Sequence, residues 1–219
     1  MTIANGRGDE NKVHILSQYG LHPLMHSVLL NGHSITCCCG QLVKDRFYQF
    51  DVVVPSSGRV VNTLYAGEDC AERFLSLSRT SGLSRITPLA LFDPLQSTAG
   101  AGPDVRDAGL AEDDAPMAPI STEVEHAIYL ALICCATPVS ESVLSDFLRK
   151  IRSHPDRPLA DWEVRAVNTA IGNGGHTLAT ILVKLREENK SLKHFAFPEM
   201  AAALRREAAR TGLRIHSCL

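Results

Sequence analysis

The sequence has few aromatic residues, no long apolar run and no secretory signal. Aromatic side chains make up only 5% of the 219 residues. The longest apolar stretch, residues 128–136, is about half the length that a membrane-spanning helix needs. The first twelve residues, MTIANGRGDENK, have neither the basic start nor the apolar centre of a signal peptide. These absences argue against a membrane or secreted protein, and we expect a cytoplasmic location with no membrane partner.

A recognisable arrangement of catalytic side chains is also missing. None of the nine histidines has the H-E-x-x-H spacing, and neither a G-x-S-x-G motif nor a pair of catalytic carboxylates accompanies them. The glycine-rich segment 172–175 precedes a predicted helix but lacks the lysine of a phosphate-binding loop. We therefore predict a protein that is not an enzyme and has no small-molecule substrate.

Cysteine, by contrast, is abundant and clustered. An odd number in tight groups does not suit a disulfide framework and instead favours metal binding or buried thiols in a reducing compartment. The seven cysteines are Cys37, Cys38, Cys39, Cys70, Cys134, Cys135 and Cys218.

Charge and composition divide the chain into three parts. Residues 93–119 are rich in alanine, glycine and proline and carry an excess of five negative charges, which predicts a flexible acidic linker. Residues 1–92 and 120–219 carry small positive excesses of one and two charges. The overall net charge of −2 therefore does not exclude a nucleic-acid partner.

The first part, residues 1–92, reads as a small β-rich module. Short β-like segments flank Asn31-Gly32, a dipeptide typical of tight hairpins. Residues 47–54 and 59–65 predict a second hairpin, and residues 68–78 then change to helical periodicity.

The last part, residues 120–219, reads as a five-helix domain. Capping residues predict the start of three helices, at Thr122, Ser140 and Asp161, and a fourth helix is predicted from about Thr177 to Glu188. A fifth is predicted from Pro198 to about Gly212, since proline is accepted in a first helical turn and glycine commonly follows a last one. The predicted fold class is therefore α+β, with a β-rich module before a mainly helical domain.

A structural zinc site is the most specific feature of the first part. Cys39-Gly40 predicts a knuckle turn, and Cys70 lies where the predicted helix begins, a position that stabilises a thiolate. Knuckle, hairpin and helix-borne cysteine follow one another as in treble-clef-like zinc modules. We predict Zn²⁺ as a structural cofactor bound by Cys37, Cys39 and Cys70.

The fourth zinc ligand has three candidates. Cys38 is adjacent to the predicted ligands, but on an extended strand it would point to the opposite face. His33 lies about 13 Å upstream in extended chain and needs a bend to reach the metal. His26 is the third candidate, and the sequence leaves the choice open.

Candidate contacts to nucleic acid lie in the last predicted helix. Arg205, Arg206 and Arg210 could form a phosphate-binding patch, although a solvated, ion-paired helix face is the alternative. The helices predicted at 161–172 and 177–188 have helix-turn-helix proportions, which would suit a DNA-binding regulator. A zinc-stabilised adaptor that binds other proteins is the third reading.

The cysteine motifs also support a resemblance to a known family. Cys37-Cys38-Cys39-Gly40 and Gly67-Glu68-Asp69-Cys70-Ala71, within residues 25–80, resemble the zinc-finger region of the compact large subunit of plasmid-borne type IV CRISPR interference complexes. The chain length and the helical second half agree with that family.

The resemblance implies a role in antiviral defence without enzymatic activity. It implies a ribonucleoprotein subunit that sits at the 5′ end of a guide RNA, against other protein subunits. It further implies that the subunit inspects the DNA that flanks the target, while base pairing reads the target sequence itself.

Overall fold

A computed structural model describes residues 6–30, 33–82, 85–95, 117–135, 143–175 and 177–219. The chain divides into two compact units, Met1–Asp93 and Pro94–Leu219. Most of the predicted acidic linker, residues 93–119, lies outside the described residues, as does the predicted helix cap Ser140.

The first unit is built on a three-stranded antiparallel sheet. Its strands are β1 (Gly20–Val28), β4 (Arg46–Val53) and β5 (Val60–Gly67), in the order β1-β4-β5. A second, two-stranded sheet pairs β2 (Ile35–Thr36) with β3 (Leu42–Val43). The predicted hairpin of residues 47–54 and 59–65 is confirmed as β4 and β5.

The hairpin predicted around Asn31-Gly32 is wrong, although those two residues themselves are not described. The strand that precedes them, β1, pairs along its length with β4, and the short strand that follows them, β2, pairs with β3. The physical reason is that eight residue pairs between β1 and β4 outweigh a local turn preference.

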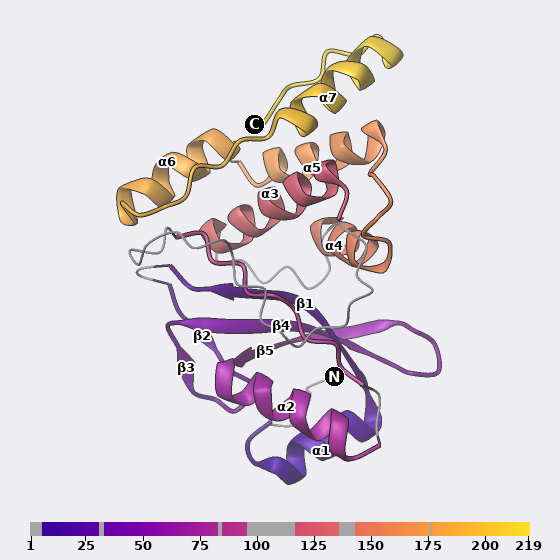
Figure 1. Cartoon of the computed structure of the whole chain (residues 1–219), viewed down its shortest axis with the longest axis vertical. Helices are drawn as coiled ribbons and strands as arrows, with labels where there is room; N and C mark the ends of the chain where they lie inside the picture. Colours follow the sequence, from indigo (N-terminus) through magenta and orange to yellow (C-terminus); the bar gives the residue numbers. More distant parts are fainter. Residues whose placement is uncertain (1–5, 31–32, 83–84, 96–116, 136–142, 176) are drawn as a thin grey trace. The chain divides into compact units, whose positions relative to one another are not determined.

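Two helices, α1 (Asp9–Gln18) and α2 (Glu68–Thr80), lie on the same side of this sheet (Figure 1). Their apolar side chains and those of the sheet form one core, in which Phe50 and Phe74 are fully buried. Ile15 and Leu16 are the contribution of α1. The sequence did not predict α1, because two adjacent apolar residues make no helical stripe.

The second unit consists of helices in its described residues. They are α3 (Pro119–Cys135), α4 (Val143–Ser153), α5 (Asp161–Asn173), α6 (Leu178–Glu188) and α7 (Pro198–Thr211). Each described helix corresponds to one of the five predicted from the sequence. Within this unit α5 packs mainly against α7, and α6 packs mainly against α3.

Two predicted helix starts need correction. Thr122 lies inside α3, where its hydroxyl donates to the carbonyl of Ala118, because Pro119 already begins the helix. Asp161 is the first helical residue of α5, and the carboxylate of Glu163 accepts the N–H of the preceding Ala160. Thr177 does cap α6, since its Oγ1 accepts the N–H of Thr180 at 3.1 Å.

The end of the chain is held against the second unit by Asn168. The buried amide of Asn168 donates to the carbonyl of His216 at 2.9 Å and accepts the N–H of Cys218 at 2.8 Å. The carbonyl of Cys218 in turn accepts the N–H of Leu178, the first residue of α6. The tail therefore satisfies a donor that would otherwise be unpaired at that helix start.

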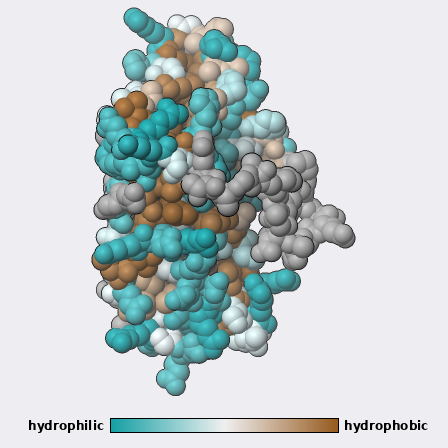
Figure 2. All heavy atoms as spheres, turned by 60° about the vertical axis from the view of Figure 1, so that its left-hand side comes forward, coloured by the Kyte–Doolittle hydropathy of each residue, from teal (hydrophilic) through white to brown (hydrophobic). Residues whose placement is uncertain are grey.

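These observations confirm a mixed α and β fold. None of the described helices combines the length and the apolarity that crossing a membrane requires. Hydrophilic side chains cover much of the face drawn in Figure 2.

Candidate metal centre

The turn that carries the three consecutive cysteines is the tip of the β2–β3 hairpin. The N–H of Gly40 donates to the carbonyl of Cys37, and the N–H of Cys37 donates to the carbonyl of Gln41, both at 2.8 Å. Gly40 has a φ of 86°, a conformation that residues with a side chain rarely adopt. The glycine therefore lets the chain reverse directly after the cysteines.

The fourth cysteine is presented by the first turn of α2. Cys70 is the third residue of this helix, whose N-cap is Gly67. The N–H of Gly67 points at the sulfur of Cys37, with an N···S distance of 3.4 Å. The turn and the helix start thus lie side by side, and Figure 1 shows the β2–β3 hairpin beside the beginning of α2.

The thiols of these two elements converge. The ligand atoms of Cys37, Cys38 and Cys70 all lie within 4.8 Å of one another. The thiol of Cys39 also interacts with those of Cys37 and Cys70. This group can hold a metal ion.

One sulfur separation is that of tetrahedral coordination. The sulfurs of Cys37 and Cys38 are 3.9 Å apart, and that of Cys70 lies within 4.8 Å of both. Four thiolates around zinc at the usual Zn–S length of about 2.3 Å would be separated by about 3.8 Å. The Cys37–Cys38 pair therefore has the spacing that zinc requires.

The site differs in two respects from the predicted set of Cys37, Cys39 and Cys70. Cys39 is not a member of the converging group, although its thiol interacts with two of the members. Cys38 belongs to the converging group, because residues 38–39 form a turn and the alternation of an extended strand does not apply to them. The group found among the described residues contains no histidine. The ring of His26 instead stacks on Tyr48 and bonds through Nδ1 to the carbonyl of Leu89.

Electrostatics set Cys37 apart from the other thiols. A hydrogen bond from the Cys38 thiol lowers the pKa of Cys37, and the backbone N–H groups of Cys39 and Gly67 lower it further. The bond with Cys37 and burial together raise the pKa of Cys38. Burial is the main cause that raises the pKa of Cys70 to about 12. Cys37 is therefore the thiol that most readily forms a thiolate. A metal ion that binds here would have to displace the protons of Cys38 and Cys70.

One buried cation lies near these thiols and was missed from the sequence. Lys12 of α1 is only 5% exposed, and its Nζ donates to the carbonyl of Gly6 at 2.8 Å. The N–H of Gly6 donates to the carbonyl of Cys38. A single lysine in a polar helix carries no sequence signal of burial, so only the fold could identify it.

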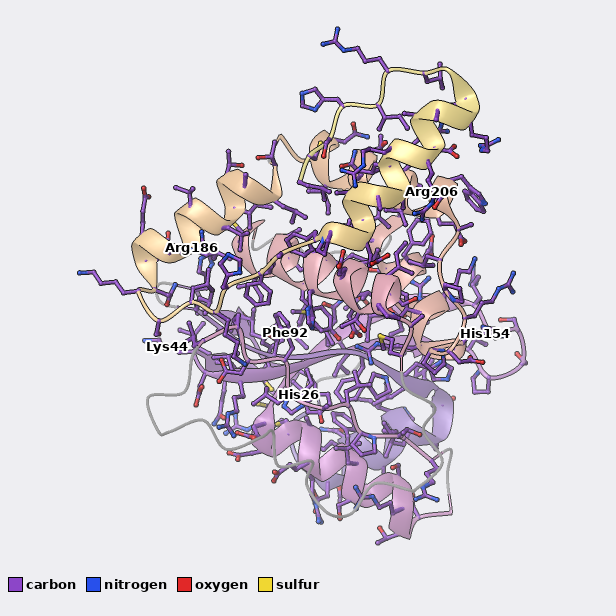
Figure 3. The ribbon with its side chains drawn as sticks, turned by 45° about the horizontal axis from the view of Figure 1, so that its top comes forward. His26, Lys44, Phe92, His154, Arg186 and Arg206 are labelled. Atoms are coloured by element: carbon purple, nitrogen blue, oxygen red, sulfur yellow. The ribbon has the colours of Figure 1, made fainter. Side chains whose placement is uncertain are left out.

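The predicted nucleic-acid arginines lie on α7, but two of them are engaged by carboxylates. Arg206, labelled in Figure 3, makes a bidentate contact with Asp161, with a shortest distance of 2.7 Å. Arg210 binds the buried carboxylate of Glu207 at 2.9 Å. Arg205 is exposed, and no ion pair of the described residues includes it.

A second group of cations lies on α6 and on the segment that follows it. The side chains of Lys184, Arg186, Lys190 and Lys193 are exposed, and Arg186 is labelled in Figure 3. None of the ion pairs between described residues includes any of the four. These cations are more available to an anionic partner than Arg206 and Arg210.

Comparison with known proteins places the chain in a family. The profile of the family described as "Uncharacterised conserved protein UCP028583" matches residues 4–211. The chain belongs to this family. The match spans both units, including the four cysteines of residues 37–70 and the cations on and after α6. No curated protein and no solved structure matches the chain significantly.

Proposed function

We propose that the protein is a non-enzymatic binding subunit whose first unit is held together by one structural zinc ion. The convergence of thiols from the β2–β3 turn and from the start of α2 carries this proposal. Cys37, Cys38, Cys39 and Cys70 are the proposed ligands. The order of knuckle, β4–β5 hairpin and helix-borne cysteine supports a treble-clef-like module.

The chemistry of the donors favours zinc. Sulfur donors in tetrahedral spacing are typical of zinc or of iron–sulfur centres. Backbone N–H groups directed at the sulfur of Cys37 supply part of the stabilisation that an anionic centre needs. Apparent binding energies of about 10–16 kcal/mol for structural zinc would stabilise a unit of this size substantially.

The ligand count supports a structural role. Catalytic zinc sites keep one coordination position open for water or substrate, whereas structural sites are closed by four protein ligands. Four thiolates from this chain would fill the coordination sphere. A zinc ion bound in this way would hold the hairpin against α2 and perform no reaction.

Nucleic acid is the proposed partner, and the exposed cations of the second unit support it. Lys184, Arg186, Lys190 and Lys193 are exposed and belong to no ion pair between described residues, and phosphate contacts of such cations dominate nucleic-acid affinity. Together with the resemblance of the cysteine motifs, this favours a subunit of a CRISPR-type ribonucleoprotein that contacts guide RNA and target-flanking DNA.

Isolation of the protein from its native host, with its partners, tests this function. The proposal expects about one zinc per chain and copurified RNA of a discrete length, together with other protein subunits. Changing Lys190 and Lys193 to glutamine should release the RNA at lower salt, whereas changing the carboxylate-bound Arg206 should have less effect. A metal-free folded protein, or a complex without nucleic acid, contradicts the proposal.

A protein-binding adaptor is the second candidate. The pairing of Arg206 with Asp161 and of Arg210 with Glu207 favours it, because these arginines already have partners. Copurified protein without RNA or DNA would support this candidate. The helix-turn-helix alternative gains no support from the packing, because α5 lies mainly against α7 and α6 mainly against α3.

A further inference from the structure

The ammonium group of Lys12 has an unusual environment. Its side chain is 5% exposed, and its Nζ lies 5.7 Å from the centre of the Phe74 ring. No ion pair between described residues includes Lys12. The nearby carboxylate of Asp9, on which the charge of Lys12 also acts, is bound bidentately by Arg73 instead. Burying a cation without an ion-paired anion is costly.

The position of Lys12 connects it to the thiols. Its Nζ donates to the carbonyl of Gly6, whose own N–H donates to the carbonyl of Cys38 at 3.0 Å. Gly6 lies so close to this cysteine that an added Cβ would come within 2.9 Å of the Cys38 sulfur. The charge of Lys12 also acts electrostatically on Cys70. Lys12 of α1 is therefore linked to the cluster through Gly6 and through its charge.

The charge of the proposed centre supplies the missing partner. Four thiolates carry four negative charges and a zinc ion carries two positive ones, so the complex has two negative charges in excess. Such an anion is stabilised by nearby cations and by N–H donors. We propose that Lys12 is the buried counter-charge of the thiolate metal centre and that it increases the affinity of this site for zinc.

This inference rests on the proposed zinc site and makes Lys12 a positioning residue for it. A buried ammonium without an anionic centre beside it and a buried tetrathiolate complex without a cation would each be destabilising. Placed together, each reduces the desolvation cost of the other. The anionic centre therefore explains why a lysine lies in the core beside Phe74, where an apolar residue would otherwise pack better.

Zinc affinity in three variants of the full chain tests the inference. Lys12→Gln keeps an N–H donor and removes the charge, Lys12→Arg restores the charge, and Lys44→Gln makes the same chemical change at an exposed lysine between β3 and β4. Competition with a chromogenic chelator measures the affinity of each. We expect a loss of about 10–100-fold for Lys12→Gln, as for other outer-sphere partners of metals. Lys12→Arg should recover most of it, and Lys44→Gln should equal the wild type.

The outcomes distinguish failure of the Lys12 role from failure of the zinc site. Equal zinc affinities of the wild type and Lys12→Gln overturn the counter-charge role and leave the zinc site intact. A wild type that binds no zinc overturns the proposed function itself, and the role of Lys12 with it. Should glutamine prevent folding with zinc present, Lys12→Met keeps the aliphatic stem and provides the same comparison. A loss that arginine does not recover also contradicts the inference, because it would reflect packing and not charge.

Discussion

Cys38 shows how one local conformation changes the chemistry of a site. Two adjacent cysteines on a strand would point to opposite faces, but the turn after Cys37 brings both sulfurs to 3.9 Å. Cys38 thereby becomes a candidate ligand that strand alternation excludes. The conformation follows from Gly40, whose positive φ closes the turn.

Substitution of Cys38 tests its place in the metal centre. We expect Cys38→Ser to weaken zinc binding by more than the factor of about 10–100 that loss of an outer-sphere partner costs, since a ligand itself is removed. Chelator competition measures this loss. Cys218→Ser is the control, because Cys218 lies in the second unit and should leave the zinc content unchanged. Equal affinities of Cys38→Ser and the wild type would leave the metal with other ligands.

Gly172 is a second residue at which the fold restricts the sequence. A Cβ at this position of α5 would lie 2.6 Å from the sulfur of Cys218. We expect Gly172→Ala to lower the free energy of unfolding by about 1–3 kcal/mol, because this overpacking exceeds the gain in helix propensity. Urea denaturation followed by circular dichroism measures the change.

Removal of the opposing sulfur provides the control for Gly172. In a Gly172→Ala, Cys218→Ala double variant the close contact disappears, so the two effects should not add and most of the loss should be recovered. A double variant as unstable as the sum of the single ones would show that the sulfur is not the obstacle.

At the scale of elements, a buried carboxylate joins α5 and α7. Glu207 of α7 is buried and is contacted by Arg210 of its own helix and by Arg165 of α5. The hydrogen bond from Arg210, followed in effect by the charges of Arg210 and Arg165, lowers the pKa of Glu207. The ionised form is therefore favoured in the folded state.

The sign of this shift predicts a pH dependence. Since the folded pKa is below the unfolded value of about 4.3, the contribution to stability is complete above that value and is lost as the pH falls through the folded pKa. We expect Glu207→Gln to be less stable than the wild type at pH 7, with a difference that shrinks on acidification below about pH 4.3. Thermal unfolding across this range measures it. Glu187→Gln, an exposed change on α6, should show no such trend.

The sequence predicted correctly those elements whose ends depend on contacts between residues close together in the chain. Thr177, Pro198 and Gly212 mark helix ends through contacts within one turn, and the structure confirms the helices that they border. The pairing of β1 with β4 depends on residues far apart in the chain, so the local signal of Asn31-Gly32 misdirected it. Helix α1 was missed because its buried face consists of two adjacent apolar residues and a lysine, which form no apolar stripe.

The candidate site shows the same dependence on local signals. Cys37 and Cys70 could be identified from the sequence because cysteine at a predicted turn and at a predicted helix start is typical of zinc ligands. The inclusion of Cys38 and the approach of Lys12 depend on a backbone conformation and on packing that no periodicity encodes. The ion pair of Arg206 with Asp161 likewise joins residues that are far apart in the sequence, whereas Glu207 and Arg210 are neighbours on one helix.

At the scale of the whole molecule, the proposed metal site belongs to one unit only. Cys37, Cys38, Cys39 and Cys70 lie in Met1–Asp93, whereas the second unit has its own helical core. We expect a strong chelator to unfold the first unit and to leave α3–α7 folded. Hydrogen exchange read by mass spectrometry should then increase in α1, α2 and the sheet, and not in the helices beyond residue 119. Loss of protection throughout the chain would mean that the two units unfold together.

The hydrogen bonds of Asn168 make residues 216–219 part of the interior of the second unit. Truncation before His216 would remove the partners of both the N–H and the carbonyl of the Asn168 side-chain amide, and of the first N–H of α6. Such a truncation would therefore act as a core defect and not as the trimming of a surface segment.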